Sequence, residues 1–156
     1  MISAQNTKLV QMLAPVSQSA ASDQVTAALD TLGFNYASVI FLGGVVNAGG
    51  LTLFKITECD TSGGTYTDVS NNDGVLGFGE TGQKNVDGTT SADIDGTDGT
   101  IYGIEINLAA RKRFLKVKYT AAGGASLCAV CGILSRASEA ESDNLSDRGF
   151  TGLIRG

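Results

Sequence analysis

The sequence predicts an all-β fold, an antiparallel β-sandwich of the jelly-roll type. Three observations support this class: 35 of the 156 residues are Val, Ile or Thr, which suit half-buried strands; turn signals rich in glycine recur between short strand-like segments; and no stretch sustains a helical apolar period. A chain of this length buries about two-thirds of its unfolded surface around one core. We expect an N-terminal arm or first strand over residues 1–14, one sandwich domain over 15–137 and a polar C-terminal tail over 138–156.

The first segments are weakly patterned. Residues 8–13 alternate between polar and apolar types, which predicts a first or edge strand that Pro15 ends. From Val25, alternate residues as far as Leu29 share an apolar face with Thr26 opposite, which predicts a short strand or a helical turn.

The next segments predict the first half of the sandwich. Residues 34–46 are apolar on both faces, as in a central strand that is covered on both sides. A glycine-rich turn over 47–50 and a strand over 51–58 predict a hairpin with that central strand. Another turn and a short strand over 65–69 follow.

The chain then becomes acidic before strand patterns resume. Between Asp73 and Asp98, six acidic residues and one lysine give a local charge of -5, equal to the net charge of the whole chain. Repeated Asp-Gly pairs there predict long loops with short irregular strands and turns. Residues 101–108 alternate most regularly and predict a half-buried strand, and further strands are predicted over 111–120 and 124–134, the last apolar on both faces.

Composition excludes several classes of function. The chain contains no histidine, which removes Ser-His-Asp and Cys-His catalysis and histidine zinc sites. Its 11 basic and 16 acidic residues argue against a nucleic-acid partner, which needs a cationic footprint. No apolar run reaches the roughly 18 residues that span a bilayer, and the N-terminus lacks a secretion-signal pattern, so we expect no membrane partner. Three cysteines suggest free thiols in a reducing compartment.

Cys128 and Cys131 have the CxxC spacing of redox and zinc sites. Thioredoxin-type pairs open a helix, and a zinc site needs four ligands, whereas this chain has one further cysteine and no histidine. We therefore expect buried structural thiols.

Two acidic motifs match functional signatures only in part. Asp93, Asp95 and Asp98 resemble part of a calcium loop, but the glycine and glutamate of an EF-hand fall out of register, so a solvated turn is favoured. The sequence Asp60-Thr61-Ser62-Gly63 is similar to the aspartic-protease signature, but Ser62 interrupts it, and a turn is again the better interpretation.

Five cations lie within eight residues, and they allow two interpretations. Lys112, Lys116 and Lys118 share one face beside Phe114, as in a docking stripe for an acidic partner. The favoured alternative is an exposed sheet face whose lysines protect an edge and pair with neighbours such as Glu105. The full set is Arg111, Lys112, Arg113, Lys116 and Lys118.

Three segments together resemble the small capsid decoration, or cement, proteins of tailed bacteriophages. Residues 29–46 contain an Asp-Thr-x-Gly-Phe turn that leads into an apolar strand, residues 51–69 contain a strand that ends in a Glu-x-Asp turn, and residues 109–134 contain an Arg-rich turn that leads into a strand. The resemblance covers about residues 25–137; the acidic stretch and the C-terminal tail have no counterpart in it.

This resemblance implies a structural role. It implies a β-sandwich, often a homotrimer, that is made in the host cytoplasm, sits on the capsid exterior and bridges neighbouring major capsid subunits. Such a protein is not an enzyme, and we expect no catalytic, cofactor-binding or metal-binding residues. The strands over 34–46 and 124–134 would build the core and a trimer seam, and the N-terminal arm or the 138–156 tail would reach the capsid.

Alternatives remain open at this stage. The first is a carbohydrate-binding module with Ca²⁺ in its acidic loops, although the chain has no tryptophan for stacking on sugars. The second is an enzyme that uses a pair of carboxylates. The third is another virion component, such as a tail or fibre module.

Overall fold

The computed structural model describes residues 7–18, 22–44, 51–69, 75–79, 82–84, 101–121 and 126–137. These residues confirm the all-β prediction, since the only helix among them is a single 3₁₀ turn, Leu108–Ala110. The strands are β1 (Thr7–Gln18), β2 (Asp23–Val25), β3 (Leu29–Asp30), β4 (Phe34–Gly43), β5 (Leu51–Cys59), β6 (Thr67–Asp68), β7 (Val75–Gly79), β8 (Gly82–Lys84), β9 (Ile101–Asn107), β10 (Phe114–Ala121) and β11 (Ser126–Ala137). No helix in the described part of the chain is long and apolar enough to cross a membrane.

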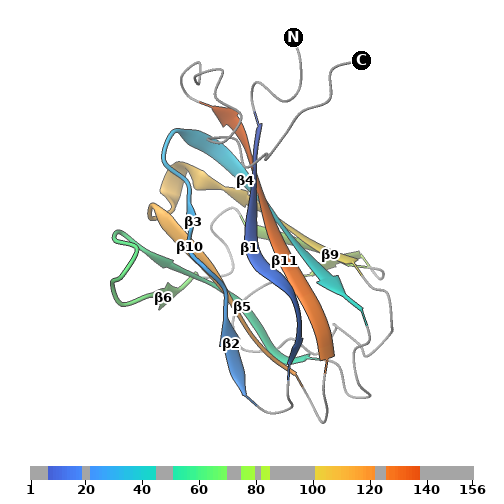
Figure 1. Ribbon diagram of the computed structural model, residues 1–156. Coiled ribbons are helices and arrows are strands. Elements are labelled where there is room, and N and C mark those ends of the chain that lie inside the picture. The colour runs from blue at the N-terminus through green and yellow to red at the C-terminus, as the bar shows by residue number, and fades with distance from the viewer. Residues whose placement is uncertain are drawn as a thin grey trace, which may run out of the picture.

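Two antiparallel sheets form a sandwich with the strand order of a jelly roll. One sheet has the order β1-β11-β4-β9-β7-β8, and the other has the order β2-β10-β5-β6, with β3 also paired to β10. The first and last strands are therefore neighbours, and the chain crosses repeatedly from one sheet to the other, as in a jelly roll. Figure 1 shows β1 and β11 side by side along one layer, with β10 and β5 in the other.

The core lies between the two sheets and is centred on aromatic rings. Phe41 of β4 is fully buried and makes edge-to-face contacts with Phe54 and Tyr119 of the other sheet, with ring centroids 5.5 Å apart in both pairs. Tyr102 of β9 packs beside Phe41 at 6.5 Å. Alternate aliphatic residues of β9 and β10 complete this core, and for β9 the regular alternation predicted them.

Pro15 does not end the first strand, contrary to the sequence prediction. β1 continues to Gln18, and its pairing with β11 shifts register between Gln11 and Leu13 and again between Leu13 and Val16. β1 is the edge strand of its sheet. Proline has no backbone N–H to donate to the sheet, so it is tolerated on an edge strand or at a bulge. Pro15 lies on the edge strand and within the second of these register shifts.

Thr26 points inward and Val25 outward, which reverses the predicted faces at these two residues, whereas Leu29 is buried as predicted. The Thr26 backbone N–H donates to the Val117 carbonyl oxygen at 3.0 Å, and the Thr26 hydroxyl oxygen accepts from the Val117 N–H, also at 3.0 Å. The side chain thus replaces a backbone carbonyl in the ladder. The backbone N–H of the next residue, Ala27, donates to the carbonyl oxygen of Met12 in the opposite sheet at 2.9 Å, so this corner connects the two sheets.

The predicted hairpin between residues 34–46 and 51–58 is wrong. β4 pairs with β11 and β9, whereas β5 pairs with β10 and β6 in the other sheet. Two strands that are apolar and adjacent in sequence pack well in either arrangement, so the pattern alone did not separate a hairpin from a crossing between sheets.

The later strands agree with the sequence in kind and differ in length. The strand predicted over 124–134 is β11 and extends to Ala137, whereas the strand predicted over 65–69 shortens to two residues of β6. In the acidic region, β7 and β8 form an antiparallel pair, which fits the predicted short irregular strands. The remainder of the stretch from Asp73 to Asp98 and the tail over 138–156 lie outside the described residues.

Candidate functional site

The outer face of the six-stranded sheet is apolar over four neighbouring strands. On β4 the inward residues are buried, whereas Leu42 on the outer side keeps 39% of its surface exposed. The prediction that this strand is covered on both sides is therefore wrong. We call the outward apolar residues the apolar face: Leu9 of β1, Leu127, Ala129, Cys131 and Ile133 of β11, Ile40 and Leu42 of β4, and Ile101 of β9.

The backbone register brings these side chains together. Cys131 lies opposite Ile40, and Ala129 lies opposite Leu42. Leu42 in turn lies opposite Ile101, which is 63% exposed. Cross-strand neighbours on one face lie within side-chain reach, so these residues form a continuous surface.

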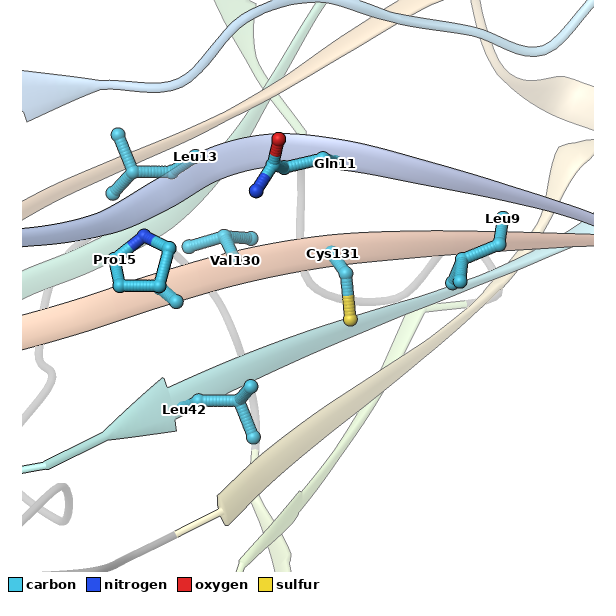
Figure 2. Close-up of a pocket in the computed structure, with 8 residues that line it drawn as sticks. Leu9, Gln11, Leu13, Pro15, Leu42, Val130 and Cys131 are labelled. Atoms are coloured by element: carbon cyan, nitrogen blue, oxygen red, sulfur yellow. The ribbon is translucent and has the colours of Figure 1, made fainter. Parts of the chain in front are cut away.

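A groove of about 280 Å³ runs along this face between β1, β11 and β4. Figure 2 shows Leu9, Leu13 and Gln11 on β1 above Cys131 of β11, with Leu42 of β4 on the far side. Pro15, Ala129 and Val130 complete the lining. Gln11 has the one side-chain amide among these lining residues, and none of them carries a formal charge.

The same sheet face becomes polar toward its other end. The Ser38 hydroxyl donates to the Glu105 carboxylate at 2.8 Å, across β4 and β9. Tyr36 and Asn107 lie opposite each other one step further along. The apolar face is therefore bounded on this side by polar residues, as interaction surfaces often are.

The opposite outer face, on the five-stranded sheet, carries lysines that have partners within the chain. Lys116 lies over the Tyr66 ring at 4.2 Å, and Lys55 donates to Asp68 at 2.8 Å. Lys118 forms an ion pair with Asp23. Hydrogen bonds from Lys118 and Thr120 lower the pKa of the Asp23 carboxyl.

The two arginines of the cationic stretch are also paired. Arg113 makes a bidentate contact with Asp30, with both N–O distances 2.8 Å, and this hydrogen bonding lowers the pKa of the Asp30 carboxyl. Arg111 is largely buried, 3.6 Å from the Glu58 carboxylate.

The predicted role of these cations is corrected in two respects. β10 lies between β2 and β5, so its lysines do not protect an edge strand. Glu105 lies in the other sheet and does not pair with them. Pairing with acidic neighbours is confirmed for Arg111, Arg113 and Lys118, but through other carboxylates, those of Glu58, Asp30 and Asp23.

The cysteine prediction is half right. Cys59 and Cys128 are buried, and burial raises the pKa of the Cys128 thiol to about 11. Cys131 is partly exposed on the apolar face, because residues three apart on a strand point to opposite sides. All three thiols are free.

The two acidic motifs have different outcomes. Residues 60–64 form a turn at the end of β5, with the Gly64 N–H donating to the Thr61 carbonyl oxygen at 3.1 Å, as the turn interpretation predicted. The segment with Asp93, Asp95 and Asp98 lies outside the described residues.

Comparison with known proteins gives a distant structural likeness. No family model matches the sequence, and a search of curated proteins finds no match. Among solved structures, the crystal structure of the SPBc2 prophage-derived protein YomS aligns with a TM-score of 0.45 and 13% sequence identity, over 81% of this chain and 93% of that one. A likeness this distant assigns neither a family nor an activity.

The sequence predicted that the strands over 34–46 and 124–134 build the core and a trimer seam, but not which of their side chains face outward. Both β4 and β11 are apolar on both sides, and for β4 this pattern predicted coverage on both sides. A strand covered on both sides and a strand with one side reserved for a partner have the same composition, so only the arrangement of the sheets separates them.

Proposed function

We propose that this chain is a structural protein of a phage particle. In this proposal it is not an enzyme: it decorates the outside of the capsid and stabilises the lattice by bridging neighbouring major capsid subunits. The phage assignment rests on the resemblance of residues 25–137 to decoration proteins. The single structural observation that supports a role in assembly is the apolar face, which leaves large aliphatic side chains exposed on a stiff sandwich.

Binding by repeated contact needs no reactive group. A standard interface buries roughly 800 Å² per partner, and several linked copies of a weaker contact give high avidity. A protein that binds only the assembled lattice also stabilises that lattice by mass action. In this proposal the protein acts as a homotrimer, and the N-terminal arm over 1–14, of which residues 1–6 precede β1, or the tail over 138–156 contributes to the contact with the capsid.

The proposal is tested on the parent particle. Heads that lack the chain are mixed with the purified protein, and bound protein is measured by co-sedimentation and quantitative gel analysis. The proposal predicts saturable binding at a fixed ratio to the major capsid protein, and a higher temperature of head disruption after binding. Deletion of residues 1–6 or of residues 138–156 locates the contact: weaker binding by one of them identifies that terminus, and unchanged binding by both places the contact on the sandwich.

Other outcomes would favour the alternatives. Attachment to tails alone would make the chain another virion component. Absence from purified particles, together with saturable binding to a polysaccharide on a glycan array, would support the carbohydrate-binding module and overturn the proposal.

A further inference from the structure

We propose that the apolar face is the seam between copies of this chain, with the Gln11 amides of the copies hydrogen-bonded to one another around the symmetry axis. This inference deepens the proposed function, because it names the surface through which a homotrimer forms. It commits the groove between β1, β11 and β4 to one kind of occupant, the apolar faces of the neighbouring copies around a three-fold axis.

The first step is the size of the exposed surface. Ile101, Leu127, Leu42 and Leu9 keep 63, 44, 39 and 38% of their surface in contact with solvent. With their half-buried neighbours they offer on the order of 500 Å² of apolar surface, which is large for a monomer and is most of what one partner contributes to a standard interface. Covering this surface with protein removes it from water.

The second step is charge. The chain carries a net charge of -5, so its copies repel one another at long range. The side chains that line the groove carry no formal charge, and on the outer face of this sheet Glu105 of β9 lies beyond the apolar residues, beside Ser38. A strongly charged partner would find no complementary charge there, whereas a second copy presents an equally apolar surface.

The third step is the side chain of Gln11. It lines the groove among aliphatic residues and lies beside Cys131 in the pairing of β1 with β11 (Figure 2). A primary amide carries both a donor and an acceptor, so it can bond to the identical group of a symmetry-related copy. Closed symmetric oligomers bring equivalent residues close to one another around their axis, which would satisfy this amide in an otherwise apolar seam.

The test is sedimentation of the purified full chain without any capsid present. The wild-type protein should sediment as an oligomer that dissociates on dilution. Leu42→Lys places an unpaired charge in the seam of every copy and should raise the dissociation constant at least about 100-fold. Leu32→Lys is the matched control, because Leu32 is 66% exposed in the turn before β4 and is not part of the apolar face; its dissociation constant should equal that of the wild type.

A second variant, Gln11→Glu, still tests the seam if Leu42→Lys does not fold. Gln11→Glu changes one exposed side chain on the edge strand and should weaken association about tenfold or more, with partial recovery at high salt, because like carboxylates then face one another. Far-ultraviolet circular dichroism should remain that of the wild type in all three variants. A wild-type chain that stays monomeric up to about 100 µM would overturn the inference, as would equal effects of Leu42→Lys and Leu32→Lys.

This outcome is independent of capsid binding. A chain that self-associates through this face but is absent from particles would sustain the seam and overturn the proposed function. A monomer that saturates heads would do the reverse.

Discussion

Replacing Thr26 by valine removes a hydroxyl from the corner that links the two sheets, with little change in side-chain shape. Thr26 is 3% exposed, and its hydroxyl oxygen accepts from the buried Val117 N–H at 3.0 Å. Thr26→Val leaves that N–H without its acceptor, which costs about 1–3 kcal/mol. Thr26→Ser keeps the acceptor and removes one methyl group, which costs about 0.8 kcal/mol.

The assay is urea unfolding at fixed protein concentration, followed by far-ultraviolet circular dichroism. Thr26→Val should lower the free energy of unfolding more than Thr26→Ser does, with an unchanged dependence on urea concentration, and should lower the melting temperature by roughly 4–8 °C for a 2 kcal/mol loss. Amide hydrogen exchange at Val117 should accelerate in the valine variant alone. A valine variant as stable as the wild type, or more stable than the serine variant, would refute the role assigned to this hydroxyl.

Three further predictions concern packing, pH and thiol reactivity. Gly132→Ala should lower the free energy of unfolding by about 1–3 kcal/mol, because a Cβ there would lie 3.0 Å from two methyl carbons of Leu29; a neutral result in urea unfolding would contradict the packing. Asp30→Asn should lower the free energy of unfolding by about 0.5–1 kcal/mol at pH 7, because Arg113 lowers the pKa of the Asp30 carboxyl. This difference from the wild type should vanish as the pH falls from 3.8, the ordinary pKa of the carboxyl, through its lower pKa in the folded protein. A difference that stays constant in acid would argue against the ion pair. Cys131 should be alkylated before the two buried thiols, which mass spectrometry of peptides can measure. If the apolar face is a seam, alkylation of Cys131 should be slower at high protein concentration. Alkylation of the thiols in another order would contradict the exposure of Cys131.

Most of the core was predictable from local patterns, whereas the strand order was not. The alternation of β9 identified its buried residues because a period of two places every second side chain on one face. β4 and β5 were identified as strands but placed wrongly in one hairpin. Which strand neighbours which is decided by contacts between residues far apart in the chain, such as β1 with β11, and no local pattern carries that information.

The corner at Thr26 and the exposure of the apolar face could not be predicted from the sequence, for related reasons. A buried threonine that substitutes for a backbone carbonyl has the same sequence pattern as a solvent-facing one. The outward leucines of β1 and β4 could be seen as apolar, but exposure depends on what covers the sheet. The pairing of the lysines was expected in principle, and only the fold identified their partners.

The central claim is that this protein works by adhesion on a viral shell, and cryo-electron microscopy of the parent particle tests it most directly. The account predicts density for the jelly roll on the outer surface of the head at positions of three-fold symmetry, with the sheet face that carries Leu42 turned toward the neighbouring copy. A head surface that is bare of this density, in particles whose protein content is complete, would contradict it.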